Sequence, residues 1–189
     1  MPLPNDALMD NMENVLMSEE LNYDRNLLKI EHNALLFSLT SEQINIYNVV
    51  MDALNNSTDE LFFVNGFGGS GKTYIWNTLT SRLCLNGSIV LAVASSGIAS
   101  QLIPGGRTAH SRFVIPLHCN ENSTCNIVQG SDLANLLIHT ELIISDEAPM
   151  AHKVCFEALD KSLRNIMQIR DPKSLEKYYR SFQEDLNKT

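Results

Sequence analysis

The stretch Val64–Trp76, "VNGFGGSGKTYIW", has a glycine-rich loop, a lysine and a threonine between an apolar run and a helical pattern. Residues 66–73 satisfy the pattern G-x-x-x-x-G-K-[ST] at every position. Glycines let successive backbone N–H groups turn toward phosphate oxygens, and the helix that follows adds the positive end of its dipole. The expected nucleotide-binding residues are Gly66, Gly68, Gly69, Ser70, Gly71, Lys72 and Thr73. A chance glycine-rich turn is the alternative, but the flanking patterns favour a phosphate site.

Two of these side chains have specific chemistry. Lys72 is expected to reach the β- and γ-phosphates as a catalytic residue, and the Thr73 hydroxyl is expected to bind Mg²⁺. A second apolar run, "LIISDE", ends in Asp146 and Glu147. Ligands bind at the carboxyl ends of strands in open α/β sheets, so we expect Asp146 to hold Mg²⁺ through water. Glu147 would orient and deprotonate the attacking water. The alternative is a pair of solvated surface acids.

The elements that must position these residues alternate along the chain. Short apolar runs predict buried strands at 61–64, 89–94 and 141–150. Helices are expected from Lys72 onward with Ile75, Leu79 and Leu83 in line, over 132–139 after Ser131 as N-cap, over 153–168, and from Asp171-Pro172. Strands that are apolar on both faces and alternate with helices predict an α/β fold with a parallel sheet flanked by helices, as in P-loop NTPases.

The N-terminal part is acidic: residues 1–60 hold 11 acidic and two basic residues, against 11 and 12 over residues 61–189. Leucines at helical intervals predict one or two surface helices within residues 1–39. Thr40 and Gln43 form a capping-box pattern. Gln43 has a second interpretation, because its amide presents a donor and an acceptor that match an adenine edge. The spacing alone favours the cap.

Composition limits the remaining classes. The chain has 189 residues and 44% hydrophobic content, enough for one domain with a core. No apolar run of about 18 residues predicts a membrane helix, and the acidic N-terminus does not resemble a secretion signal. Disulfides among the four cysteines are therefore not expected. A metal at His118, Cys119 and Cys125 fits no standard zinc spacing, so ordinary reduced cysteines are the favoured interpretation.

Three motifs together, "GFGGSGKTY", "ASSGIASQLIPGGRTAHSRFVIP" and "LIISDEAPM", resemble the Pif-type (petite-integration-frequency) DNA helicases of superfamily 1. The plant, Helitron-like branch is the most similar, and "EELNYDRNLLKIEHNALLFSLTSEQ" resembles the segment before the motor there. The resemblance implies a RecA-like domain and ATP- and Mg²⁺-dependent movement 5′ to 3′ on single-stranded DNA. It also implies a nuclear location, and it favours adenine recognition for Gln43, because "LTSEQ" matches the family's Q motif.

The same resemblance assigns residues 95–112 to the DNA path. The implied DNA contacts are Ser95, Ser96, Gly97, Arg107, Thr108 and His110. Hydroxyls and bare backbone N–H groups would meet phosphates, Arg107 would add charge, and Thr108 and His110 would contact backbone or base. The alternative is a glycine-rich connection packed on the domain, with His110 in a structural role.

The resemblance also has a limit. After the third strand the family continues with a γ-phosphate-sensing strand and a second RecA-like domain with arginine fingers, and neither pattern occurs in these residues. We expect an acidic segment over 1–39, part of the first motor domain over 40–170 and a divergent helix over 171–189. This chain alone is then expected to bind Mg·ATP with little hydrolysis and no unwinding. Two alternatives are a non-catalytic module that binds nucleotide or single-stranded DNA, and a truncated product without a stable fold.

Overall fold

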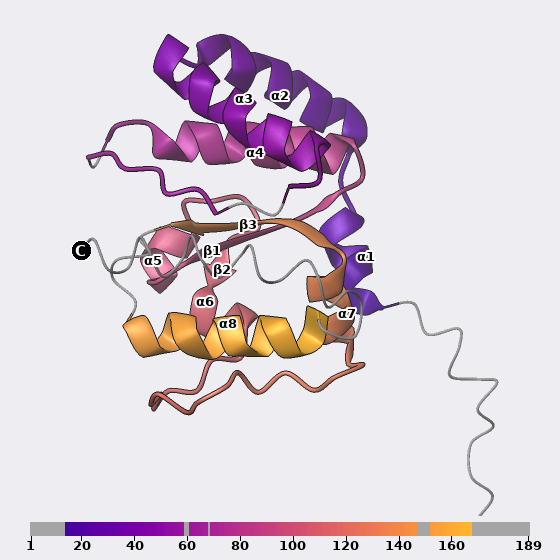
Figure 1. The fold of residues 1–189 in the computed structure, drawn as a ribbon. Coiled ribbons are helices and arrows are strands. Elements are labelled where there is room, and N and C mark those ends of the chain that lie inside the picture. Colours follow the sequence, from indigo (N-terminus) through magenta and orange to yellow (C-terminus); the bar gives the residue numbers. More distant parts are fainter. Residues whose placement is uncertain (1–13, 59–60, 68, 147–151, 168–189) are drawn as a thin grey trace, which may run out of the picture.

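The computed structural model describes residues 14–58, 61–67, 69–146 and 152–167. Three parallel strands form a sheet with helices on both faces (Figure 1), which confirms the predicted fold class. The elements are α1 (Val15–Leu21), α2 (Arg25–Ser38), α3 (Ser41–Asn55), α4 (Lys72–Leu85), β1 (Ile89–Ala94), α5 (Gly97–Ser100), β2 (Arg107–Thr108), α6 (Ala109–Arg112), α7 (Asp132–Ile138), β3 (Thr140–Asp146) and α8 (Lys153–Met167).

The central strand β1 separates two cores. All six of its residues are buried, as the apolar run predicted. Alternate side chains of a strand point to opposite faces. Leu91 and Val93 therefore pack with Phe113 and the apolar residues of α7 and α8, whereas Val90 packs with those of α3 and α4. Figure 1 shows α2, α3 and α4 above the sheet and α6 and α8 below it.

The helix beginnings follow from capping residues that the sequence predicted. Thr40 accepts a hydrogen bond from the Gln43 backbone N–H, and the Gln43 side chain accepts one from the Thr40 N–H, so the capping box is complete. Ser131 accepts from the Ala134 N–H at the start of α7. The acidic N-terminal segment contains α1, which packs against α7, and α2, which packs against α4. The helix expected from Asp171 lies outside the described residues.

One predicted strand does not form. Residues 61–64 are irregular, and the Phe63 side chain is 65% exposed. Within the described ranges β3 pairs only with β1, and no strand lies between β3 and residues 61–64. The run 61–64 therefore has no described strand with which to pair. An apolar run becomes a strand only when a neighbour satisfies its backbone N–H and C=O groups. The local pattern was therefore insufficient here.

The register of the sheet places two of the expected site residues, Thr108 and Asp146, at one edge. Ala94, the last residue of β1, lies opposite Thr108 of β2 on one side and Asp146 of β3 on the other. Because the strands are parallel, their carboxyl ends share this edge, and Thr108 and Asp146 are two strand spacings apart, about 10 Å. The predicted metal ligand and the predicted DNA-path residues therefore meet at the same edge.

Candidate nucleotide and nucleic-acid site

The start of α4 has the properties of an anion site. Gly71 is its N-cap residue with φ of 81°, in the left-handed region that favours glycine, and no side chain caps the helix there. The first backbone N–H groups of this 14-residue helix therefore lack side-chain acceptors from the described residues. Together with the helix dipole they attract a phosphate.

Lys72 bonds to its own loop. Its Nζ donates to the carbonyl oxygens of Gly66 and Phe67, the latter at 3.1 Å, and lies 3.5 Å from the Ser70 Oγ. These three oxygens hold the Lys72 ammonium against the loop backbone. A phosphate oxygen that enters the loop offers Lys72 a charged acceptor in their place, and charge-assisted hydrogen bonds are stronger than neutral ones.

At two of the loop glycines an added Cβ would displace a neighbouring side chain. A Cβ on Gly66 would lie 2.6 Å from the Ser70 Oγ, and one on Gly71 would lie 2.4 Å from the Gln43 Nε2. Gly69 has φ of 80° but open space around it. The uncapped start of α4, Lys72 and the glycine backbone fit the phosphates of a nucleoside triphosphate. Thr73 is half-buried in the first turn of α4, and Gly68 lies outside the described residues.

Gln43 joins α3 to this loop. Its Oε1 accepts from the Thr40 N–H at 2.9 Å, while its Nε2 donates to the carbonyls of Ser70 at 3.3 Å and Gly71 at 3.4 Å. The amide therefore has the capping role that its spacing favoured, and it also contacts residues 66–73, the predicted phosphate loop. No local pattern indicates this second contact, because it joins residues 27 and 28 positions apart.

The two acids expected to act with this loop, Asp146 and Glu147, are described only in part. Asp146 is half-buried at the end of β3, where the apolar run predicted it. Glu147, the expected catalytic base, lies outside the described residues, so its role stays a prediction. Carboxylate and hydroxyl oxygens are the ligand types that Mg²⁺ prefers. Asp146 and Thr73 therefore have suitable chemistry for it.

Residues 95–112 are a series of short elements rather than one loop. Ser96 caps α5 by accepting from the Ala99 N–H at 3.1 Å, and Ser95 lies directly after β1. A Cβ on Gly97 would meet no atom within 4 Å, so its backbone is approachable. Thr108 caps α6, and its hydroxyl keeps its own proton to donate elsewhere.

His110 has a partner within the domain. It is half-buried on α6, and its Nε2 lies 3.9 Å from the Cys155 Sγ on α8. This contact belongs to the packing of α6 against α8, as the structural alternative for His110 expects. A role of His110 toward nucleic acid stays a prediction.

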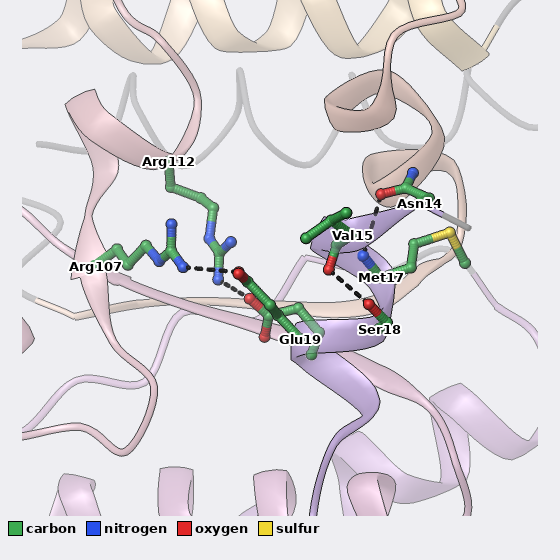
Figure 2. Close-up of polar contacts among 8 residues, drawn as sticks. Asn14, Val15, Met17, Ser18, Glu19, Arg107 and Arg112 are labelled. Carbon is green, nitrogen blue, oxygen red and sulfur yellow. Dashed lines mark hydrogen bonds and ion pairs between the residues drawn. The ribbon is translucent and has the colours of Figure 1, made fainter. Parts of the chain in front are cut away.

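Two arginines of this segment pair with α1 (Figure 2). Arg107 Nη2 lies 3.6 Å from the Glu19 Oε2, and Arg112 pairs with Glu20. The family resemblance implied a role for Arg107 but not for Arg112 or either glutamate. Arg112 and Glu20 are 92 positions apart, so no local pattern announces their contact.

The cysteines are free thiols. Burial raises the pKa of the Cys125 thiol to about 11, and it also raises the pKa of Cys84 and Cys155. These three thiols therefore remain protonated at neutral pH, and the thiolate is the form that binds metals. Across the described ranges no group of three or more His, Cys, Asp or Glu side chains is arranged to hold a metal ion.

Comparison with known proteins identifies the family. Residues 38–179 match the PIF1-like helicases. The chain belongs to the PIF1-like helicase family. It is 32% identical over 108 residues to "ATP-dependent DNA helicase PIF4" of Trypanosoma brucei brucei, a match that covers 54% of this chain and 13% of that protein. It is 29% identical over 127 residues to "ATP-dependent DNA helicase PIF1" of the same organism, covering 67% and 12%.

Membership of the PIF1-like helicases agrees with the Pif-type resemblance and with a partial RecA-like P-loop domain. The matched segments span about an eighth of each relative. The helices that the structure describes include none that is long and apolar enough to cross a membrane.

Proposed function

We propose that this chain is the nucleotide-binding part of the first motor domain of an ATP-dependent DNA helicase. The whole protein would use Mg·ATP to move 5′ to 3′ on single-stranded DNA. The observation that carries the proposal is the open, glycine-lined start of α4 with Lys72 at the loop mouth, in a chain of the PIF1-like family. The motif set also leads us to propose a place in the plant, Helitron-like branch and a nuclear location.

Each site residue then has a role. Bound Mg·ATP supplies the phosphoanhydride bond whose hydrolysis drives the motor. Lys72 exchanges its loop carbonyls for β- and γ-phosphate oxygens, and the N–H groups at the start of α4 bind the same anion. Thr73 and, through water, Asp146 would hold the Mg²⁺, which would neutralise phosphate charge, and Glu147 would orient and deprotonate the attacking water.

Gln43 serves the nucleotide site by supporting the phosphate loop. Its Nε2 donates to the carbonyls of Ser70 and Gly71, which fixes the turn that precedes Lys72. Reading an adenine edge would require this amide to exchange its present bonds for bonds to the base. We therefore propose that the base competes with Thr40 and the loop carbonyls for the Gln43 amide.

Residues 95–112 are proposed to follow the DNA backbone at the carboxyl edge of the sheet. Gly97 offers an approachable backbone, Thr108 a hydroxyl proton and Arg107 a positive charge. The other contacts assigned to this path are Ser95, Ser96 and His110. Contacts of this kind fix the backbone without reading sequence, so binding should tolerate many sequences and weaken with salt.

For the 189-residue polypeptide on its own we propose Mg·ATP binding, slow hydrolysis and no strand separation. A helicase cycle closes two motor domains on one nucleotide, and these residues supply part of one. Strand separation by the purified polypeptide would contradict this.

The first test is thermal unfolding with and without Mg·ATP. A ligand at about 100 times its Kd stabilises the native state by ~2.7 kcal/mol, which raises the midpoint of a domain of this size by roughly 5–10 °C. Lys72→Ala should remove most of that rise. Lys29→Ala, an exposed lysine on α2, is the matched control and should keep it.

The outcomes separate the alternatives. A cooperative transition that Mg·ATP raises in the parent chain and in Lys29→Ala but not in Lys72→Ala supports the nucleotide site. A cooperative transition that Mg·ATP leaves unchanged contradicts it. The absence of any cooperative transition favours the alternative of a product without a stable fold.

A further inference from the structure

Arg107, the proposed DNA-contacting cation, already has an anionic neighbour. Its Nη2 lies 3.6 Å from the Glu19 carboxylate of α1, and the two side chains are 48% and 56% exposed. The adjacent pair differs sharply: the side chains of Arg112 and Glu20 are 3% and 10% exposed. Figure 2 shows both guanidinium groups directed at the same end of α1. One pair is buried and fixed, and the other lies open to solvent.

Helix α1 is held in place without Glu19. The Asn14 Nδ2 donates to the Asp132 backbone oxygen at 2.8 Å, which ties the start of α1 to α7. Leu16 and Met17 pack against the core below the sheet, and Glu20 pairs with the buried Arg112. These contacts position the Glu19 carboxylate beside Arg107. Removing that carboxylate therefore leaves the anchoring contacts of α1 intact.

A carboxylate and a phosphate diester compete for the same guanidinium. Each carries a single negative charge, and each accepts N–H hydrogen bonds from arginine. We propose that Glu19 is an internal competitor for the phosphate site at Arg107, so that single-stranded DNA must displace its carboxylate to bind. This inference rests on the proposed DNA contact of residues 95–112. It assigns α1 a function in setting nucleic-acid affinity.

The exposure of the pair makes the exchange feasible. A solvent-exposed ion pair contributes little, because water and salt screen it, so a phosphate can replace Glu19 at small cost. For the same reason the competition is modest: removing the charge should tighten DNA binding about two- to fivefold. The buried Glu20–Arg112 pair, in contrast, is not accessible for exchange.

The test measures binding of a short fluorescein-labelled oligothymidylate to the full chain by fluorescence anisotropy, without nucleotide. The variants are Glu19→Gln, Arg107→Ala and the double variant, with Glu31→Gln as matched control. Glu31 is exposed on α2, which lies on the face of the sheet opposite α6 and α8 (Figure 1). It makes no ion pair with the residues described. Its substitution changes the net charge by the same amount at a distance from Arg107. Thermal unfolding of each variant checks that the fold is retained.

The proposal requires three results together. Glu19→Gln binds more tightly than the parent chain by more than Glu31→Gln does. The gain disappears when Arg107 is alanine, because the competition acts through that guanidinium. The gain also shrinks as salt rises from low to physiological ionic strength, since salt screens the Glu19–Arg107 attraction.

Failure of this inference differs from failure of the proposed function. If the parent chain binds and Arg107→Ala weakens binding, but Glu19→Gln behaves like Glu31→Gln, the internal competition is wrong and the DNA contact stands. If Glu19→Gln tightens binding equally in the Arg107→Ala background, the effect is general charge repulsion and the competition is again wrong. If no variant binds the oligothymidylate, the DNA contact and the competition are both overturned.

Discussion

The phosphate loop and the segment 95–112 satisfy their charges in different ways. Lys72 donates to oxygens of its own loop, within a few residues. Arg107 and Arg112 instead pair with Glu19 and Glu20, which α1 brings from the acidic N-terminal segment. The first region is organised mainly by short-range contacts, and the second depends on a helix about ninety positions away.

This difference determines how each region responds to change. A loop that satisfies its lysine with its own oxygens does not depend on a distant helix for those contacts. The arginines of residues 95–112 pair with glutamates of α1, which is distant in the sequence. A change in α1 should therefore alter both the stability of the domain and the affinity of these arginines for an anion. Substitutions in α1 should therefore act on the arginine segment, and substitutions in the loop on the nucleotide site.

The largest expected effect on stability comes from the buried pair. Glu20→Gln removes the carboxylate beside Arg112, leaving a buried guanidinium without its counter-charge. We expect the free energy of unfolding to fall by about 3 kcal/mol. Urea denaturation measures this loss. Glu19→Gln is the matched comparison, and it should cost less than about 1 kcal/mol, because its pair is half-exposed.

A double substitution shows whether the stability lost in Glu20→Gln comes from the unpaired charge of Arg112 or from altered packing. Replacing the pair by Glu20→Leu with Arg112→Met removes both charges from the interior and should recover most of the stability lost in Glu20→Gln. Equal losses in Glu20→Gln and Glu19→Gln would contradict the division into a fixed and an exchangeable pair.

The next effect tests the link between Gln43 and the phosphate loop. Gly69→Ala and Gly71→Ala both place a Cβ at a positive φ, which costs roughly 1–2 kcal/mol each. Only at Gly71 does the new Cβ also meet the Gln43 Nε2, at 2.4 Å. We expect Gly71→Ala to cost about 1 kcal/mol more than Gly69→Ala, since the amide must give up its bonds to the loop. Urea denaturation measures the difference.

A double-mutant cycle isolates that contact. In a Gln43→Ala background the additional cost of Gly71→Ala should disappear, because the atom that its Cβ would meet is gone. An additional cost that persists in this background would mean that Gln43 does not shape the loop.

The same division between local and distant contacts explains what the sequence predicted. The strand 89–94 and the capping box at Thr40 were correct, because an apolar run and a three-residue spacing are local signals. The strand at 61–64 was wrong, because strand formation requires a neighbour that the run itself does not specify. The fold class was correct because it depends mainly on the order of elements.

The candidate site divides in the same way. Eight consecutive residues predict the phosphate loop, and their place before a helix was correct. The pairing of Arg107 with Glu19 could not be predicted, because the sequence around either residue does not indicate where α1 packs. The sequence identified Arg107 through a family resemblance, yet the environment of its charge follows only from tertiary packing.

The last effect concerns α4, the helix that follows the phosphate loop, at one of its contacts with α2. His32 of α2 is buried, and its Nδ1 lies 3.0 Å from the Ser81 Oγ of α4. Burial lowers the pKa of His32 below its usual 6.5, and the charge of Arg82 adds to this, against an opposing backbone hydrogen bond at Thr78. Below pH about 6.5 the unfolded chain therefore binds a proton that the folded chain does not.

This proton linkage fixes the direction of the pH effect. The contribution of His32 to stability is complete above about pH 6.5 and is lost as the pH falls toward its lower folded pKa, by at most ~1.4 kcal/mol per pH unit. Urea denaturation of the parent chain and of His32→Gln across this range measures it, and the parent should lose more stability in acid. Parallel curves would show that His32 does not titrate with folding. A steeper parent curve would mean that burial of a neutral His32 between α2 and α4 stabilises the fold. The helix that begins at Lys72 then depends on α2 of the acidic N-terminal segment, although the loop before it satisfies its lysine locally.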